Sequence, residues 1–227
     1  MGYIIVIEGT DGCGKNTQAK LLVERLEGAG RNVKLCSFPQ YDSPSSAPVK
    51  MYLNGEFGDL NSLDAYQSSV LYAVDRLCTY NKDLKEFYEA GGVIVMDRYV
   101  YSNMLHQASK IKNKTEVDSY LDWLEEFEFG YLKLPRADKV LFLDVPVEIS
   151  QRLKEERAYK SGTTKDVHEE DVNHLRNAYN SGKYVSQKYG WNVISCVDGE
   201  ELKSIEEISD LIWCTIKDGL PNKKELF

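Results

Sequence analysis

The stretch YIIVIEGTDGCGKNTQ, residues 3–18, joins an apolar run to a glycine-rich loop and to the start of a helix. Its first part, Tyr3–Ile7, is a continuous run of mostly β-branched side chains, which is typical of a strand buried on both faces of a parallel sheet. Beyond the loop, residues 19–26 place apolar side chains at helical spacing, and Gly28 and Gly30 end the helix. A strand, a glycine loop and a helix in this order predict the first half of a βαβ unit.

The loop fits the phosphate-binding pattern G-x-x-x-x-G-K at Gly9, Gly14 and Lys15. Glycines let the backbone approach an anion closely, and the N–H groups at the start of the following helix point toward it. Lys15 is expected to reach the β- and γ-phosphate oxygens of a nucleotide. A glycine turn that simply precedes a helix is the alternative, but the position between a buried-type strand and an amphipathic helix favours the phosphate site.

The position after Lys15 usually carries Ser or Thr, whose hydroxyl binds the magnesium ion of a nucleotide, but here it is Asn16. The amide oxygen of Asn16 can bind Mg²⁺, although the side chain is longer than serine and Mg²⁺ tolerates little departure from octahedral geometry. We therefore expect the metal to be held mainly by phosphate oxygens and water, with Asn16 contributing weakly or through water.

Further apolar runs predict four more strands, separated by helical patterns, at Val33–Phe38, Val93–Met96, Val140–Leu143 and Asn192–Cys196. Strands that alternate with helices indicate parallel βαβ units. We therefore predict a three-layer α/β fold in which a parallel sheet of about five strands is flanked by helices. The chain contains no repeat or linker, so residues 1–227 are expected to form a single domain.

The composition is that of an ordinary globular protein, with 42% hydrophobic residues and a net charge of −8. The acidic balance argues against a general nucleic-acid-binding surface. No apolar run approaches membrane-spanning length, and the N-terminus lacks a basic region and a cleavage site, so a cytoplasmic protein without membrane contact is expected. Five singly scattered cysteines predict reduced thiols.

Two polar segments fit no core element. The first, Tyr41–Leu60, is rich in Ser, Pro and Gly, and we expect it to include a mobile segment that covers a substrate. The second, Lys154–Asp171, is highly charged with Gly162 near its middle, and it could close as a lid over a bound nucleotide. A solvated loop is the alternative in both cases, and composition alone slightly favours it.

Four short motifs follow the glycine loop in order along the chain: SFPQY at 37–41, LYAVDR at 71–76, MDRYVYSN at 96–103 and LFLDVP at 141–146. Together with the loop, they resemble the thymidylate kinase family over nearly the whole chain. The resemblance implies a P-loop NTPase fold, Mg²⁺-ATP as phosphoryl donor and dTMP as acceptor. It also implies dTDP and ADP as products, a place in dTTP biosynthesis, and a homodimer.

The resemblance also implies the residues of phosphoryl transfer. Arg98 would clamp the acceptor phosphate, and Asp97 would lie near the magnesium ion and its waters. Cys13 stands where some members carry a catalytic arginine, and members without it supply the charge from the lid, so Arg157 is expected to act there and Arg152 to lie near the adenine. An exposed lid arginine with no catalytic part is the alternative. The expected catalytic residues are Lys15, Arg98, Asp11 and Arg157, and the expected ATP site is Gly9, Thr10, Asp11, Gly12, Cys13, Gly14, Lys15, Asn16, Thr17 and Arg152.

Tyr72 and Arg76 lie four residues apart, so they share one face of a helix. An aromatic ring can stack on a base and an arginine can donate to its carbonyl, and the resemblance assigns these roles to Tyr72 and Arg76, with Asn103 completing the hydrogen bonds to thymine. Taken alone, Tyr72 would more simply be a core residue. His106 falls where many members place a tyrosine beside the deoxyribose, which leaves the choice between dTMP and a ribonucleotide open. The expected acceptor site is Asp11, Phe38, Tyr41, Tyr72, Arg76, Arg98, Tyr99, Asn103, His106 and Asp171.

Two other functions stay open at this point. One is a related nucleotide kinase whose acceptor is UMP, CMP or a deoxynucleoside. The other is a nucleotide-binding homologue without catalysis, for which only Asn16 argues. The presence of Lys15 together with Asp97 and Arg98 argues against it, since a protein that only binds a nucleotide has no need of a clamp for an acceptor.

Overall fold

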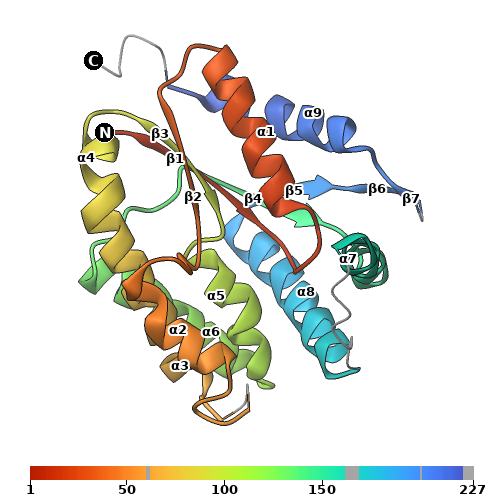
Figure 1. Ribbon diagram of the computed structural model, residues 1–227. Helices are drawn as coiled ribbons and strands as arrows, with labels where there is room; N and C mark the ends of the chain where they lie inside the picture. The colour runs from red at the N-terminus through yellow and green to blue at the C-terminus, as the bar shows by residue number, and fades with distance from the viewer. Residues whose placement is uncertain (60–61, 162–168, 200, 222–227) are drawn as a thin grey trace.

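The computed structural model describes residues 1–59, 62–161, 169–199 and 201–221, with the backbone alone for residues 154–155, 157–161 and 169–171. Five strands form one parallel sheet in the order β2-β3-β1-β4-β5 (Figure 1). The predicted α/β fold with a five-stranded parallel sheet is therefore confirmed. The strands are β1 (Tyr3–Glu8), β2 (Val33–Ser37), β3 (Val93–Asp97), β4 (Lys139–Asp144) and β5 (Asn192–Ser195).

The central strand β1 is buried on both faces because its side chains alternate between two hydrophobic clusters. Ile5 and Ile7 pack in the cluster that contains Leu22 and Ile212, whereas Ile4 and Val6 face the opposite side of the sheet. These four apolar residues of β1 are 0% exposed. The continuous apolar run in the sequence is thus explained by helices on both sides of the sheet.

Helices α1 and α9 cover one face of the sheet, while α3, α5, α6 and α8 lie on the other (Figure 1). The result is the predicted three-layer arrangement. Among the described residues, no helix is both long enough and apolar enough to cross a membrane. The longer helices are α1 (Lys15–Gly28), α3 (Ala65–Thr79), α6 (Lys114–Glu125), α7 (Val147–Ser161), α8 (Glu169–Tyr189) and α9 (Ile205–Ile216).

Shorter elements connect these layers. They are the helices α2 (Ala47–Leu53), α4 (Lys85–Glu89) and α5 (Tyr101–His106), the 3-10 turns η1 (Pro44–Ser46), η3 (Ala108–Lys110) and η5 (Lys217–Gly219), the π-helical turns η2 (Tyr80–Leu84) and η4 (Glu126–Tyr131), and the small strands β6 (Val197–Asp198) and β7 (Glu201–Leu202).

Helix α3, which carries Tyr72 and Arg76, has a start fixed by a capping box. The Asp64 carboxylate accepts a hydrogen bond from the backbone N–H of Gln67 at 2.7 Å, and the Gln67 side chain accepts one from the backbone N–H of Asp64 at 3.1 Å. Both contacts satisfy N–H groups that the first turn of a helix leaves without partners. The cap therefore sets the register of the helix that places both side chains.

The two polar segments are more helical than the sequence suggested. Residues 44–53 form η1 and α2, and Val49 and Tyr52 of α2 are buried. The expectation that Tyr41–Leu60 fits no core element is wrong there, because Ser43 caps η1 and Pro44 lies in its first turn, so residues read as loop formers begin a helix instead. In the expected lid, α7 extends to Ser161 and α8 begins at Glu169, while residues 162–168 lie outside the described residues.

Candidate active site

Two adjoining cavities lie at the carboxyl ends of β1 and β3. At this point the strand order reverses, because β2 and β3 lie on one side of β1 whereas β4 and β5 lie on its other side. In open α/β sheets, ligands bind at such a topological switch point. The loop cavity, of about 190 Å³, is lined by the glycine loop together with Asp97 and Arg98. The aromatic cavity, of about 240 Å³, contains several tyrosines, and Asp11 and Arg98 line both cavities.

The glycine loop has a shape that only glycine allows at two key positions. A Cβ atom on Gly9 would lie 2.7 Å from the Cys13 sulfur and 3.2 Å from the Leu143 carbonyl oxygen. Gly14, which caps α1, has a φ of 93°, a backbone conformation that residues other than glycine rarely adopt. Gly14 and the first residues of α1 line the loop cavity, as expected for an anion-binding helix start.

Within the loop, the buried amine of Lys15 donates a hydrogen bond to the Thr10 carbonyl at 2.7 Å. Asn16 and Thr17, which were expected in the ATP site, are exposed and line the loop cavity. Gly9 does not line the loop cavity. Thr10 and Cys13 do not line it either, and their side chains are buried. The prediction that these two residues belong to the ATP site can therefore apply only to their backbone atoms.

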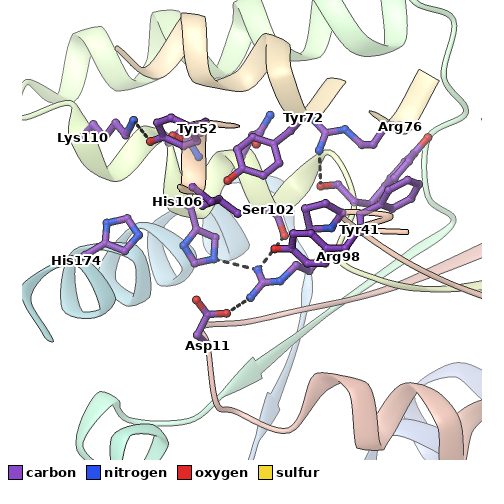
Figure 2. Close-up of a pocket in the computed structure, with 16 residues that line it drawn as sticks. Asp11, Tyr41, Tyr52, Tyr72, Arg76, Arg98, Ser102, His106, Lys110 and His174 are labelled. Carbon is purple, nitrogen blue, oxygen red and sulfur yellow. Dashed lines mark hydrogen bonds and ion pairs between the residues drawn. The ribbon is translucent and has the colours of Figure 1, made fainter. Parts of the chain in front are cut away.

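Arg98 stands between the two cavities in a strained backbone conformation. Its φ is 72°, which is uncommon for a residue other than glycine and is typically retained at functional sites. Its guanidinium forms an ion pair with Asp11 and hydrogen bonds with the Ser102 hydroxyl at 3.2 Å and the His106 Nε2 at 3.0 Å (Figure 2). Burial opposes its charge, but the carboxylates of Asp11 and Glu8 outweigh burial and raise the pKa of Arg98.

Glu8 holds the turn that carries Arg98. It is fully buried, and its carboxylate accepts hydrogen bonds from the Tyr99 backbone N–H at 2.9 Å and the Ser102 hydroxyl at 2.7 Å. Burial raises the pKa of Glu8, and the positive charges of Arg98 and Lys15 oppose that rise. Sequence reasoning gave Glu8 no role, although a charged residue that ends an otherwise apolar strand was an available signal.

Asp97 presents an oxygen suited to a hard cation. Its side chain is 8% exposed and lines the loop cavity near Lys15 and Asn16. Its Oδ1 has no hydrogen-bond partner in the part of the chain that the structure describes. A buried carboxylate oxygen without a partner, beside an anion-binding loop, fits a magnesium ion or its water ligands.

The aromatic cavity brings together the residues predicted for the acceptor. All of them line it except Asp171, whose side chain lies outside the described residues. The Tyr72 ring meets the edge of Tyr52, with ring centroids 6.4 Å apart, and burial raises the pKa of Tyr72, so its hydroxyl stays neutral. The Tyr99 hydroxyl donates to the Pro135 carbonyl at 3.0 Å, so only the ring of Tyr99 is left for a ligand.

Arg76 closes one end of the aromatic cavity through a buried ion pair. Its Nε and Nη2 donate to the two carboxylate oxygens of Glu128 at 2.7 and 2.5 Å. The side chains of Arg76 and Glu128 are 3% and 0% exposed. Glu128 lies in the π-helical turn η4, and no pattern in its surroundings, EEFEF, distinguishes it from its neighbours in the sequence.

His106 lies near the opposite end, between Arg98 and His174. The rings of His106 and His174 are stacked with centroids 5.7 Å apart. Burial, followed by the charge of Arg98, lowers the pKa of His106 to about 3. His106 is therefore neutral at physiological pH, and its Nε2 accepts the hydrogen bond from Arg98.

Lys110 is a cavity residue that sequence reasoning missed. Its amine donates to the Tyr52 hydroxyl at 2.8 Å and the Leu63 carbonyl at 3.0 Å, and it thereby joins η3 to α2 and to the segment before α3. Burial lowers the pKa of Lys110 to about 8. No motif marked this lysine, since the contact depends on the unexpected helix α2.

The predicted lid residues are not part of the described cavities. Arg152 lies on α7 with an exposed side chain and lines neither cavity. Arg157 lies on the same helix, and Asp171 lies in the first turn of α8, but both side chains are outside the described residues. The described site therefore has an anion-binding loop and an aromatic cavity, with Arg98 between them.

Comparisons with known proteins agree with this geometry. The family model for thymidylate kinase matches residues 7–202. The thymidylate kinase of Mycobacterium tuberculosis is 32% identical over 171 residues, which cover 74% of this chain and 78% of the relative. A probable thymidylate kinase of Methanococcus maripaludis is 30% identical over 226 residues, which cover 98% of each chain.

Among solved structures, a thymidylate kinase from Candida albicans has a TM-score of 0.69 and covers 96% of this chain and 92% of its own. At 22% identity, this likeness shows the fold alone. The family match and the two relatives confirm the resemblance found in the sequence motifs. The chain therefore belongs to the thymidylate kinase family and is a nucleotide-binding phosphotransferase.

Proposed function

We propose that the protein transfers the γ-phosphate of ATP to dTMP, giving dTDP and ADP for dTTP biosynthesis. The observation that carries the proposal is that Asp11 and Arg98 line both cavities. A donor phosphate on the loop and an acceptor phosphate in the aromatic cavity would meet at these two residues. This is the arrangement that direct transfer between two bound nucleotides requires.

The glycine loop would bind the donor phosphates mainly through its backbone N–H groups and through Lys15. In the structure the Lys15 ammonium donates one hydrogen bond to the Thr10 carbonyl, and because it has three N–H donors it can also donate to a phosphate oxygen. Because the backbone supplies the remaining contacts, donor binding does not depend on a hydroxyl at the position of Asn16.

Magnesium fits the site through Asp97 and Asn16, which line the loop cavity beside Lys15. The partnerless Oδ1 of Asp97 would hold the ion or one of its waters, and the Asn16 amide oxygen would contribute weakly or through water. When bound, the ion neutralises charge on the phosphate oxygens.

For the acceptor, Tyr72 offers a ring that can stack on thymine, and Arg76 and Asn103 offer polar atoms at its edge. Arg98 would clamp the acceptor phosphate, and Asp11, which pairs with Arg98, would keep the guanidinium directed at the boundary between the cavities. Phe38, Tyr41 and Tyr99 would form the walls.

Transfer of the phosphoryl group requires mainly that the two nucleotides are held in position and that positive charge surrounds the transferred group. The attacking atom is already a phosphate oxygen, so no strong general base is required, and the transition state is loose and anionic. Lys15 and Arg98 would neutralise the charge that develops between donor and acceptor. A third positive charge at the transferred phosphate would come from Arg157 of α7. Arg152 would lie near the adenine, and Asp171 would close over the acceptor.

A homodimer and a cytoplasmic location belong to the same proposal. Tyr66, Val70 and Val74 are 37–39% exposed and repeat every four residues on α3, so they form one apolar stripe suited to a second copy. Light scattering should give twice the mass of one chain, and Val70→Asp should reduce it to the mass of one.

The five cysteines are free thiols, as in proteins of a reducing compartment, which supports the proposed cytoplasmic location.

The reaction itself is tested by identifying its products. The protein is incubated with Mg²⁺-ATP labelled at the γ-phosphate, with dTMP present or absent. The proposal predicts that label appears in dTDP in an amount equal to the ADP formed. Label released only as inorganic phosphate, or no dTMP-dependent ADP, would contradict it.

A further inference from the structure

Three polar side chains interlock behind the base end of the aromatic cavity. Glu128 accepts both side-on N–H groups of Arg76, at 2.7 and 2.5 Å, and its Oε1 lies 3.5 Å from the Nδ2 of Asn103. Arg76 and Asn103 line the cavity, whereas Glu128 does not and is 0% exposed. One buried carboxylate thus contacts both side chains that face the base, without reaching the base itself.

The ion pair fixes which edge of Arg76 is available. Burial disfavours its charge, but the Glu128 carboxylate outweighs this and raises the pKa of Arg76. Since Nε and Nη2 hold the carboxylate, the Nη1 end of the planar fork is left, and there Nη1 lies 3.4 Å from the Tyr99 carbonyl (Figure 2). Arg76 can therefore offer only N–H donors to a ligand.

The same carboxylate, together with the Ser69 carbonyl, sets the direction of the Asn103 amide. Its Nδ2 lies 3.5 Å from Glu128 Oε1 and 3.4 Å from the Ser69 carbonyl oxygen, and both of these oxygens can only accept. These contacts are long, but turning the amide over would place its oxygen against two others. The contacts of the Asn103 side chain among the described residues are both made by Nδ2, so its Oδ1 remains as the acceptor that the side chain can offer to the cavity.

The pair of a donor from Arg76 and an acceptor from Asn103 matches one type of pyrimidine. Thymine and uracil present an O4 acceptor beside an N3–H donor, whereas cytosine presents an amino donor at position 4 beside an N3 acceptor. Cytosine would thus oppose both side chains at once, and buried polar groups left unpaired make such a site strongly selective.

We infer that Glu128, which touches no nucleotide, is the positioning residue that makes the site select 4-oxo over 4-amino pyrimidines. The inference rests on the proposed acceptor site and deepens it. It assigns a role in base recognition to a residue of η4 that neither the motifs nor the cavity lining indicated. Without Glu128, the Arg76 fork would lose its two short hydrogen bonds and keep only the long contact to the Tyr99 carbonyl, and the Asn103 amide would keep only its contact to the Ser69 carbonyl, so the donor and acceptor pattern would be held less firmly.

The test is equilibrium binding of dTMP and dCMP to the whole protein by calorimetry, with Glu128→Gln as the variant. Glutamine keeps the shape of Glu128, but its amino group faces the donors of Arg76 or Asn103. The wild type should prefer dTMP by on the order of a hundredfold or more, and Glu128→Gln should reduce this ratio by about tenfold or more. In turnover, the KM for dTMP should rise while kcat at saturation and the KM for ATP change little.

Glu126→Gln is the matched control, because Glu126 is exposed in the same turn and lines neither cavity. It should leave the dTMP to dCMP ratio unchanged. Glu128→Gln leaves a buried guanidinium without its counter-ion and could fail to fold. In that case Glu128→Asp, which keeps the charge but withdraws it by one methylene, carries the test with the same expected fall in the ratio.

A folded Glu128 variant with the wild-type dTMP to dCMP ratio would overturn the inference. A wild type without preference for dTMP over dCMP would overturn it as well. Because binding is measured without turnover, a wild type that prefers dTMP but makes no dTDP would contradict the proposed reaction alone. A fall in selectivity caused by Glu128→Gln and not by Glu126→Gln would support the inference.

Discussion

The loop cavity and the aromatic cavity adjoin one another but are built in opposite ways. The loop cavity is lined mainly by one short segment, residues 11–17 without Cys13, with Asp97 and Arg98 added from the end of β3, and its anion site would be formed by backbone N–H groups. The aromatic cavity is lined by residues from many parts of the chain, namely α2, α3, α5, η3, α8 and the segments that follow β1, β2 and β3, and its base end is held by a buried ion pair. A backbone site tolerates most side-chain changes, whereas a side-chain site depends on each contributor.

Lys15 should be the exception within the loop cavity, because its charge cannot be supplied by the backbone. Lys15→Ala should lower kcat by about 10³ or more, the size of effect expected of a cation that stabilises the phosphoryl transition state. The measurement is ADP release at saturating Mg²⁺-ATP and dTMP, with dTMP binding as the control that should not change. A loss of less than about tenfold would contradict the assignment.

Arg98, which both cavities share, should have an effect of similar size. Arg98→Ala should lower kcat by about 10³ and also weaken dTMP binding, because the same guanidinium would hold the acceptor phosphate. Arg98→Lys keeps the charge without the planar fork and should recover part of the activity. An Arg98→Ala protein with nearly normal turnover would break the claim that the cavities meet at this residue.

Tyr72 tests whether the aromatic cavity depends on its side chains. Tyr72→Leu should raise the KM for dTMP by about 10- to 100-fold, since stacking of a base on an aromatic ring contributes roughly 1–3 kcal/mol. Tyr72→Phe keeps the ring and is the matched control, with little change expected. The KM for ATP should stay the same in both variants, and equal dTMP KM values for Leu and Phe would refute the stacking role.

Asn16 tests whether the loop cavity is insensitive to a change of side chain. If backbone N–H groups bind the phosphates and phosphate oxygens bind the metal, Asn16→Ala should lower kcat by less than about tenfold. Asn16→Ser should be active and should need a somewhat lower magnesium concentration. Both are measured by titrating Mg²⁺ at fixed ATP. A loss with Asn16→Ala as large as that with Lys15→Ala would show that the amide is an essential metal ligand.

His106 should produce the smallest effect, on stability rather than on turnover. Its pKa is lowered to about 3 in the folded protein, while the unfolded chain takes up the proton near the ordinary value of 6.5. The free energy of unfolding should therefore fall as the pH drops from about 6.5 toward 3, by at most about 1.4 kcal/mol per pH unit from this residue. His106→Gln keeps an acceptor for Arg98 and should make the decline in urea-unfolding free energy between pH 7 and 5 shallower. An unchanged decline would show that His106 can be protonated in the folded state.

Most residues that line the loop cavity are contiguous, so the glycine motif indicated them, although Gly9, Thr10, Cys13 and Arg152 of the expected ATP site do not line it. Gly9, Gly14 and Lys15 lie within seven positions, and the strand and helix around them have clear apolar patterns. The same patterns predicted the five parallel strands to within a residue or two. The prediction was wrong for the segment around Ser43 and Pro44. These residue types are common in loops, but before an apolar turn they also suit the start of a helix, which is what they form here.

The aromatic cavity was predicted only in part. Family motifs indicated the residues that face a ligand, such as Tyr72 and Arg76, because they lie in recognisable segments. They did not indicate the residues behind them. Lys110 lines the cavity, whereas Glu8 and Glu128 lie behind it, and all three act through contacts across 58, 91 and 52 positions of the chain. The charge that ends the apolar strand could have singled out Glu8, but a single sequence does not show which distant residue each of the three contacts.

The most direct test of the account is ADP release by the wild-type protein with Mg²⁺-ATP and, in turn, dTMP, dUMP, UMP, CMP, dGMP and AMP. We expect the highest kcat/KM for dTMP, activity with dUMP through the same base edge, and little activity with CMP or the purine nucleotides. The ratio of kcat/KM for dUMP to that for UMP will show whether a site with His106 beside the sugar discriminates against the 2′-hydroxyl of ribose. Preference for CMP or a purine nucleotide, or no activity with any acceptor in a protein that binds ATP, would contradict the account.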